Sequence, residues 1–205
     1  MAARAHWGFA RPTMRSLSDS SGNGGFHPGI TSRVRIPEKE KSMSADTVER
    51  LLVEELKDLY SAEKQITRAL PKMAKSATND QLRQAFENHL KETEDQIERL
   101  DRAFEILGKS SSGKTCKAMQ GLIEEGGEQM QELKGEILDA ALICAAQKVE
   151  HYEMAGYGSV RTWAQQLGQK EIADLLQQTL DEEGNTDHKL TQLAGKINKQ
   201  AQKAA

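Results

Sequence analysis

The sequence predicts an all-α fold, a four-helix bundle with an extra short crossover helix between its two halves. Apolar residues recur with helical spacing over four long stretches of the chain. Proline is scarce, with four residues in all, and the body of the chain is rich in Ala, Leu, Glu and Gln. These residues favour helix over strand, so no sheet is expected.

Composition and charge exclude several other classes of protein. A chain of 205 residues is long enough for one domain with its own core. The net charge is −3, with Lys and Arg interspersed among Asp and Glu, so nucleic acid is not an expected partner. No apolar run approaches the ~20 residues of a membrane span, so no membrane partner is expected. Cys116 and Cys144 form no paired framework, which is typical of reduced thiols in a cytoplasmic protein.

Residues 1–42 are interpreted as a disordered N-terminal tail. Gly, Ser, Arg and Pro are frequent in this segment, and no apolar periodicity is found. The composition loosely resembles a transit peptide, but the apolar periodicity of such peptides is missing. A plain tail, or translation that starts at Met43, is therefore favoured over a targeting signal. The helical domain is expected over residues 43–200.

The first two long helices have recognisable ends. The first begins near Asp46, where Asp46 and Glu49 can form a capping box, and Pro71 is expected to kink or end it. The second begins after Asn79, a good N-cap, and Gly108 can close it. The apolar stripes of these helices run through Leu52, Leu56, Leu59, Ile66 and Leu70, and through Leu82, Phe86, His89, Thr93, Ile97, Leu100 and Phe104.

The second half of the bundle follows a long connection. A loop at 109–114 leads to a shorter helix over about 115–132, and two long helices then cover about 134–164 and 169–199. Helices near 30 residues are about 45 Å long. Four of them with one long middle connection predict a ferritin-like bundle.

The connection also contains a stretch that matches a known phosphate-binding motif. Residues 108–115, GKSSSGKT, match the phosphate-binding pattern G-x-x-x-x-G-K-[ST] letter for letter. That motif binds phosphate when it follows a strand. Here the segment before it has apolar residues at helical spacing, so a helix precedes it. A phosphate-binding role is therefore not expected.

Four carboxylates fall on helix faces that should be apolar, namely those of Glu63, Glu92, Glu150 and Glu183. Three of them fit the apolar stripe, whereas Glu92 flanks it, three residues after His89. A single glutamate on a helix is more often exposed to solvent than buried. A buried carboxylate must be paired, protonated or bound to a cation, and no basic residue falls on these stripes. Four together, one from each long helix, therefore predict a pair of divalent cations.

Five segments of the chain resemble the YciE/YciF family of bacterial ferritin-like proteins. They are LKDLYSAEKQITRAL at 56–70, HLKETEDQIERLD at 89–101, CKAMQGLIEEG at 116–126, AALICAAQKVEHYEMAGYG at 140–158 and TLDEEGNTDHKLTQLA at 179–194. The resemblance covers about 46–200. It implies a four-helix ferritin-like core, a homodimer, a dinuclear metal site and a role in the stress response.

The sequence departs from the ferritin pattern of Glu-x-x-His on two helices. Glu92 is followed at +3 by Asp95 and Glu183 by Thr186, so the best-placed histidine is His89, one turn before Glu92. An oxygen-rich ligand set suits hard cations, so two divalent ions are expected, iron or else manganese. The predicted metal ligands are Glu63, Glu92, Glu150 and Glu183, with Asp187, Glu153, Asp95 and His89 to complete or support them.

Two functions follow from these residues. The first is ferroxidase-like or peroxide-consuming chemistry, in which iron meets O₂ or peroxide and Tyr60 and Tyr157 supply hydrogen bonds near the metal. The alternative is a dimeric, stress-induced structural or interaction protein with a vestigial metal site. Metal analysis separates the two, since about two equivalents of Fe or Mn per chain favour the first.

Overall fold

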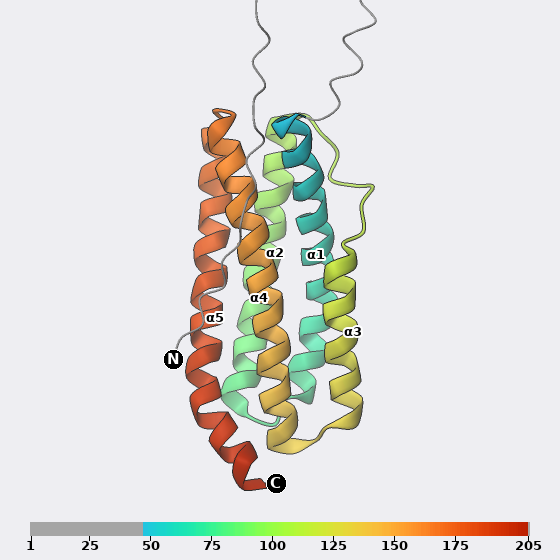
Figure 1. Cartoon of the computed structure of the whole chain (residues 1–205), viewed down its shortest axis with the longest axis vertical. Coiled ribbons are helices and arrows are strands. Elements are labelled where there is room, and N and C mark those ends of the chain that lie inside the picture. The colour runs from blue at the N-terminus through green and yellow to red at the C-terminus, as the bar shows by residue number, and fades with distance from the viewer. Residues whose placement is uncertain (1–46, 205) are drawn as a thin grey trace, which may run out of the picture. The chain divides into compact units, whose positions relative to one another are not determined.

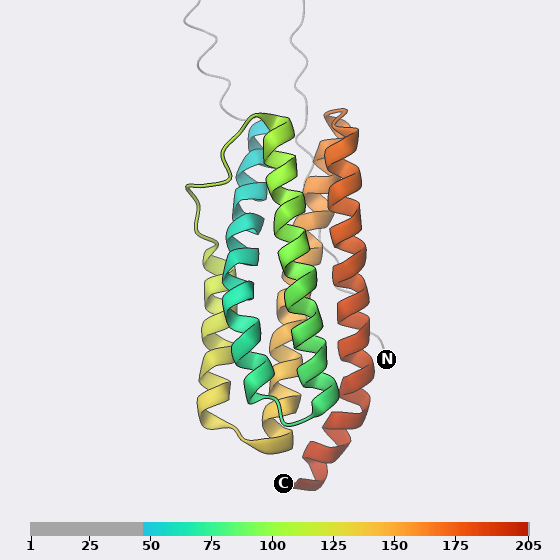
Figure 2. The same ribbon diagram turned by 180° about the vertical axis from the view of Figure 1, so that it is seen from behind.

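A computed structural model describes residues 47–204 as a bundle of α-helices. Four long helices lie side by side, and a shorter one packs outside them against α1 and α4 (Figures 1 and 2). The helices are α1 (Val48–Ser76), α2 (Asp80–Leu107), α3 (Lys117–Glu132), α4 (Gly135–Gln166) and α5 (Lys170–Ala204). The prediction of an all-α bundle with an extra short helix is confirmed. The predicted tail at 1–42 and the predicted cap Asp46 lie outside the described residues.

Helix α1 begins at a different cap and continues past its proline. Thr47 is the N-cap, and its Oγ1 accepts a hydrogen bond from the Arg50 N–H at 3.2 Å. The helix does not end at Pro71 but runs to Ser76. Proline removes one backbone hydrogen bond, but Leu70 and Ala74 on either side are buried in the core. Burial of this apolar face offsets the loss, so tertiary packing overrides the local signal.

Helix α2 has the predicted caps at both ends. The Asn79 side chain accepts hydrogen bonds from two backbone N–H groups, at 3.0 and 3.1 Å. Gly108 closes the helix with φ 61° and ψ 34°, a left-handed conformation that costs glycine little. The segment that resembles a phosphate-binding loop thus follows a helix and not a strand.

Helix α3 is fixed at its N-terminus to both neighbouring helices. Cys116 is the N-cap and is fully buried. Its backbone N–H donates to Ser61 Oγ at 2.9 Å, and its carbonyl accepts from Gln65 Nε2 at 3.0 Å, both on α1. The Cys116 Sγ also lies 3.0 Å from the Tyr152 hydroxyl of α4, with which it forms a hydrogen bond. Few buried residues hold α3 beyond this end, since only Met119 and Gly126 of the helix are buried.

The apolar core is divided into two clusters along the bundle axis. One holds Leu52, Leu56, Leu59, Leu100, Phe104, Tyr157, Val160, Ile172 and Leu176 among others. The other holds Ile66, Leu70, Leu82, Phe86, Leu138, Leu142, Leu190 and Ile197 among others. On each long helix, the residues between these two sets include buried polar side chains. In the described part of the chain, no helix is long and apolar enough to cross a bilayer.

A buried aspartate that the sequence patterns did not reveal ties the α1–α2 turn to α4. Asp139 is 1% exposed. Its carboxylate accepts hydrogen bonds from the Thr78 N–H at 2.8 Å, the Thr78 hydroxyl at 2.5 Å and the Asn79 N–H at 2.9 Å. One side chain of α4 therefore fixes where α2 begins.

Asp139→Ala should lower the free energy of unfolding by about 2 kcal/mol, because it removes three hydrogen bonds at a turn where some of the freed donors can reach water. Chemical denaturation followed by circular dichroism measures the change. Glu136→Ala, an exposed acid on the same helix, is the control and should cost less than about 1 kcal/mol. Equal losses in the two variants would contradict the role of Asp139.

Candidate metal centre

A layer of buried acidic side chains lies between the two apolar clusters and takes residues from all four long helices. Glu63 comes from α1, His89 from α2, Glu150 and Glu153 from α4, and Glu183 from α5; none is more than 4% exposed. Four of them, His89, Glu150, Glu153 and Glu183, each place a potential ligand atom within 4.8 Å of the other three. Glu63 stands beside this group of four and interacts electrostatically with Glu183. We call these five residues the acidic layer.

When its carboxyl groups are ionised, the acidic layer contains many polar atoms that make no hydrogen bond within residues 47–204. They are Glu63 Oε2, Glu150 Oε2, both Oε atoms of Glu153, Glu183 Oε2 and both ring nitrogens of His89. His89 Nε2 lies 3.3 Å from a Glu150 oxygen, close to it but without hydrogen-bond geometry. Buried polar atoms without partners are costly and rare. A cation shared by these oxygens and the imidazole would satisfy them together, so the residues fit a metal ion.

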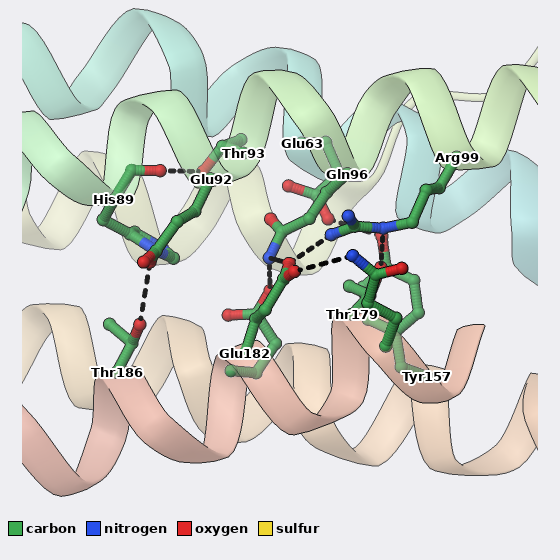
Figure 3. A network of polar contacts seen from close by, with 12 residues as sticks. Glu63, His89, Glu92, Thr93, Gln96, Arg99, Tyr157, Thr179, Glu182 and Thr186 are labelled. Atoms are coloured by element: carbon green, nitrogen blue, oxygen red, sulfur yellow. Dashed lines mark hydrogen bonds and ion pairs between the residues drawn. The ribbon is translucent and has the colours of Figure 1, made fainter. Parts of the chain in front are cut away.

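In two carboxylates of the layer, those of Glu63 and Glu183, a neighbouring side chain forms a hydrogen bond with one oxygen and not with the other. The Tyr157 hydroxyl donates to Glu63 Oε1 at 2.5 Å (Figure 3). Gln96 Nε2 donates to Glu183 Oε1. The second oxygen of each of these carboxylates has no partner. Hydrogen bonds of this kind orient metal ligands and hold them ready for a cation.

Burial and mutual repulsion raise the pKa values of the carboxyl groups. Burial, followed by repulsion from Glu183, raises the pKa of Glu63 to about 8. The pKa values of Glu150 and Glu153 lie well above their usual range, again mainly because of burial and then because of neighbouring carboxylates. Burial also raises the pKa of Glu183. Without a cation, the layer therefore retains protons near neutral pH.

Two predicted ligands, Glu92 and Asp187, do not join the buried group. The Glu92 side chain is 33% exposed; it accepts from Thr186 Oγ1 at 3.3 Å and lies 3.6 Å from both His89 Nδ1 and Lys189 Nζ. Asp187 accepts from Gln147 Nε2 at 3.0 Å. Glu92 flanks the apolar stripe, as its spacing indicated, and so reaches the edge of the layer. Glu153 takes the inner place because it lies three residues after Glu150, on the same face of α4.

Three other expectations need correction. Tyr60 was expected near the metal, but its hydroxyl donates to Asp101 at 3.4 Å. Asp95, considered as a supporting ligand, is exposed. A basic residue does lie close to the layer: Arg99 is 12% exposed, forms an ion pair with Glu182, and donates to Thr179 Oγ1 at 2.9 Å (Figure 3). Its position three residues after Gln96, on the same helix face, is the signal that could have revealed it.

The fold and the acidic layer define a class of protein, an all-α bundle whose buried His/Glu cluster could hold a metal ion. Residues 47–203 match the family described as a domain of unknown function, DUF892. The chain is also 50% identical over 166 residues to Protein YciF of Escherichia coli (strain K12), which covers 80% of this chain and 100% of that protein. The chain therefore belongs to the YciF (DUF892) family.

Solved structures agree with this assignment. The crystal structure of the E. coli stress protein YciF matches with a TM-score of 0.73 at 48% identity, over 75% of this chain and 98% of that one. YcfI of Rhodopseudomonas palustris, whose description proposes a structural protein, matches with a TM-score of 0.70 at 47% identity, over 73% and 96%. A Xanthomonas campestris protein, 21% identical with a TM-score of 0.58 over 74% and 93%, shares the fold alone.

The free energy of unfolding of the metal-free protein should fall as the pH rises from about 5 to about 8. An unperturbed Glu titrates near 4.5, whereas Glu63 in the folded protein titrates near 8. Between these values the folded state binds more protons than the unfolded state, so raising the pH favours unfolding. Denaturant titrations of chelator-treated protein at several pH values measure this slope.

Glu63→Gln is the matched variant, because it keeps the shape and removes the titration. At pH 8 it should be more stable than the metal-free parent, by an amount on the order of 2 kcal/mol, and its slope with pH should be shallower. A free energy of unfolding that rises with pH in this window would contradict the burial of ionisable groups in the layer.

Proposed function

We propose that this chain binds two Fe(II) ions in the acidic layer and oxidises them with peroxide or O₂. The observation that supports this proposal is the set of unpartnered carboxylate oxygens and imidazole nitrogens that face one another inside the bundle. Bundles of four helices that hold two metals use inward carboxylates from each helix in the same way. The proposal also agrees with the description of the E. coli relative as a stress protein.

The charges of the layer support two divalent ions. Glu63, Glu150, Glu153 and Glu183 carry four negative charges when ionised, which two divalent cations balance. Carboxylate oxygens with a single imidazole are ligands for hard ions, so iron or manganese fits better than copper or zinc. Because the pKa values of these carboxyls are raised, cations bind by displacing protons, and binding should strengthen with pH.

In the proposed reaction iron is the substrate. Two Fe(II) ions lose one electron each, and one hydrogen peroxide takes both electrons and two protons to give two waters. The chain supplies the ligands that keep the two ions together, and Tyr157 and Gln96 hold those ligands in place. The apolar clusters on both sides exclude bulk water from the layer.

A polar groove gives Glu92 a place in this proposal. The groove lies between α2 and α5, has a volume of about 750 Å³, and is lined by Glu92, Asn88, Thr186 and Lys189 among others. Glu92 also faces His89 Nδ1 across 3.6 Å. A carboxylate that contacts both the groove and the acidic layer is suited to pass a cation from solvent to the buried ligands. We therefore keep Glu92 as a ligand of the incoming ion.

Glu150→Ala and Glu63→Ala should each reduce bound iron to less than about half and slow Fe(II) oxidation about tenfold or more, because each removes a ligand that the other helices cannot replace. Metal analysis after anaerobic loading and stopped-flow absorbance with hydrogen peroxide measure the two effects. Glu94→Ala, an exposed acid on α2, should change neither. Oxidation no faster with the parent protein than with these variants would remove the proposed activity.

The alternative function remains a dimeric structural or interaction protein with a vestigial metal site. The description of YcfI as a proposed structural protein supports it. We propose a homodimer in either case, as the family resemblance implies. If anaerobic reconstitution leaves neither iron nor manganese on the chain, the structural role replaces the first proposal. Light scattering during size-exclusion chromatography tests the homodimer separately.

A further inference from the structure

A second route reaches the acidic layer from the side that α3 covers. A cavity of about 310 Å³ lies between α1, α3 and α4, and His89 and Glu150 form part of its lining. Figure 1 shows α3 beside α1 and α4. Both lining residues belong to the acidic layer and both are buried, at 4% and 1% exposure. The cavity therefore ends at the proposed metal ligands.

Most residues that line this cavity are apolar, and Gln65, Arg68 and Lys72 also line it. The apolar residues include Ile66, Leu70, Leu122, Ile123, Met130 and Val149. Two of the lining residues, His89 and Glu150, carry buried polar atoms, His89 Nε2 and Glu150 Oε2, that have no hydrogen-bond partner among residues 47–204. A mainly apolar space of about 300 Å³ with a few polar groups in its lining is typical of a small-molecule pocket.

The size and polarity of the cavity do not suit the reactants named so far. A metal cation or hydrogen peroxide gains nothing from aliphatic walls, since both are small and strongly hydrated. A molecule with an apolar body and one reactive polar end would fill the space and bring that end to His89 and Glu150. The volume corresponds to a molecule of roughly ten to fifteen non-hydrogen atoms, within the range of small-ligand pockets.

We propose that the cavity binds an organic hydroperoxide, with its alkyl or aryl body between α1, α3 and α4 and its O–O group at the acidic layer. This inference rests on the proposed iron oxidation and names the oxidant. Two Fe(II) ions give one electron each to the O–O bond, which breaks. Two protons are taken up, and the products are two Fe(III), one alcohol and one water. Apolar burial of the body supplies affinity that hydrogen peroxide lacks.

Two glycines of α3 provide a matched pair of variants. Gly127 lines the cavity, whereas Gly121 does not. A Cβ added at either position meets nothing within 4 Å, so neither substitution creates a clash at that atom. Leucine is also a better helix former than glycine, so both variants should fold. Gly127→Leu is expected to reduce the space available for a ligand, and Gly121→Leu is the control. Val149→Phe narrows the same cavity from α4.

The experiment compares two oxidants with Fe(II)-loaded protein. With cumene hydroperoxide, Gly127→Leu and Val149→Phe should oxidise Fe(II) about tenfold more slowly than the parent and Gly121→Leu, because the apolar body loses its site. With hydrogen peroxide, all four proteins should agree within about twofold. Equal effects on both oxidants, or no effect on either, would overturn the cavity as an oxidant site.

A binding measurement keeps this inference separate from the proposed function. Cumyl alcohol has the same apolar body and no O–O bond, and its binding to metal-free protein can be followed by saturation-transfer NMR. The parent and Gly121→Leu should give a signal that Gly127→Leu and Val149→Phe lose. If hydrogen peroxide oxidises Fe(II) on the protein but cumyl alcohol does not bind, only this inference fails. If the parent protein oxidises Fe(II) with neither peroxide nor with O₂, the proposed function fails and this inference fails with it.

Discussion

The burial of four carboxylates at one level of the bundle is the constraint on which the rest of the structure depends. An isolated ionised carboxylate in an apolar interior is prohibitively costly, and Glu63, Glu150, Glu153 and Glu183 lie together. Raised pKa values relieve part of this cost by keeping protons on the layer. A layer that is held this way in the metal-free protein gains stability from any cation that replaces those protons.

The apolar clusters on the two sides of the layer make this burial tolerable. Each long helix contributes apolar side chains on both sides of its position in the acidic layer, so the helices are fixed independently of the charges. Fixed helices in turn hold the carboxylates close together in spite of their repulsion. The Tyr157 hydroxyl forms a hydrogen bond with one oxygen of Glu63, and Gln96 does the same with one oxygen of Glu183, so the other oxygen of each carboxylate is left for a cation. The layer is therefore preorganised by the fold rather than by the ion.

Sequence periodicity was sufficient for the helices and for most of the acidic layer, because both depend on which residues share a helix face. Glu63, Glu150 and Glu183 fit the apolar stripes and are buried, whereas Glu92 flanked its stripe and is partly exposed. Periodicity could not rank Glu153 above Asp187, since both lie one turn from a buried glutamate. It also missed the bond of Asp139 to a distant turn and the continuation of α1 past Pro71. These depend on contacts between helices, which spacing along one helix does not contain.

Helix α3 explains why the bundle has two kinds of approach to one layer. Between α2 and α5, where α3 does not reach, the surface is a groove lined by charged and polar side chains. Between α1 and α4, α3 covers the bundle, and its Leu122, Gly126 and Gly127 leave a cavity rather than a filled interface. The helix is anchored through Cys116 to Ser61 and Gln65, while few of its other side chains are buried. Along the rest of the helix, partly buried Leu122, Ile123 and Met130 pack against the core. The crossover helix thus adds a covered cavity on one side of the acidic layer, which a bundle of four helices alone would not have.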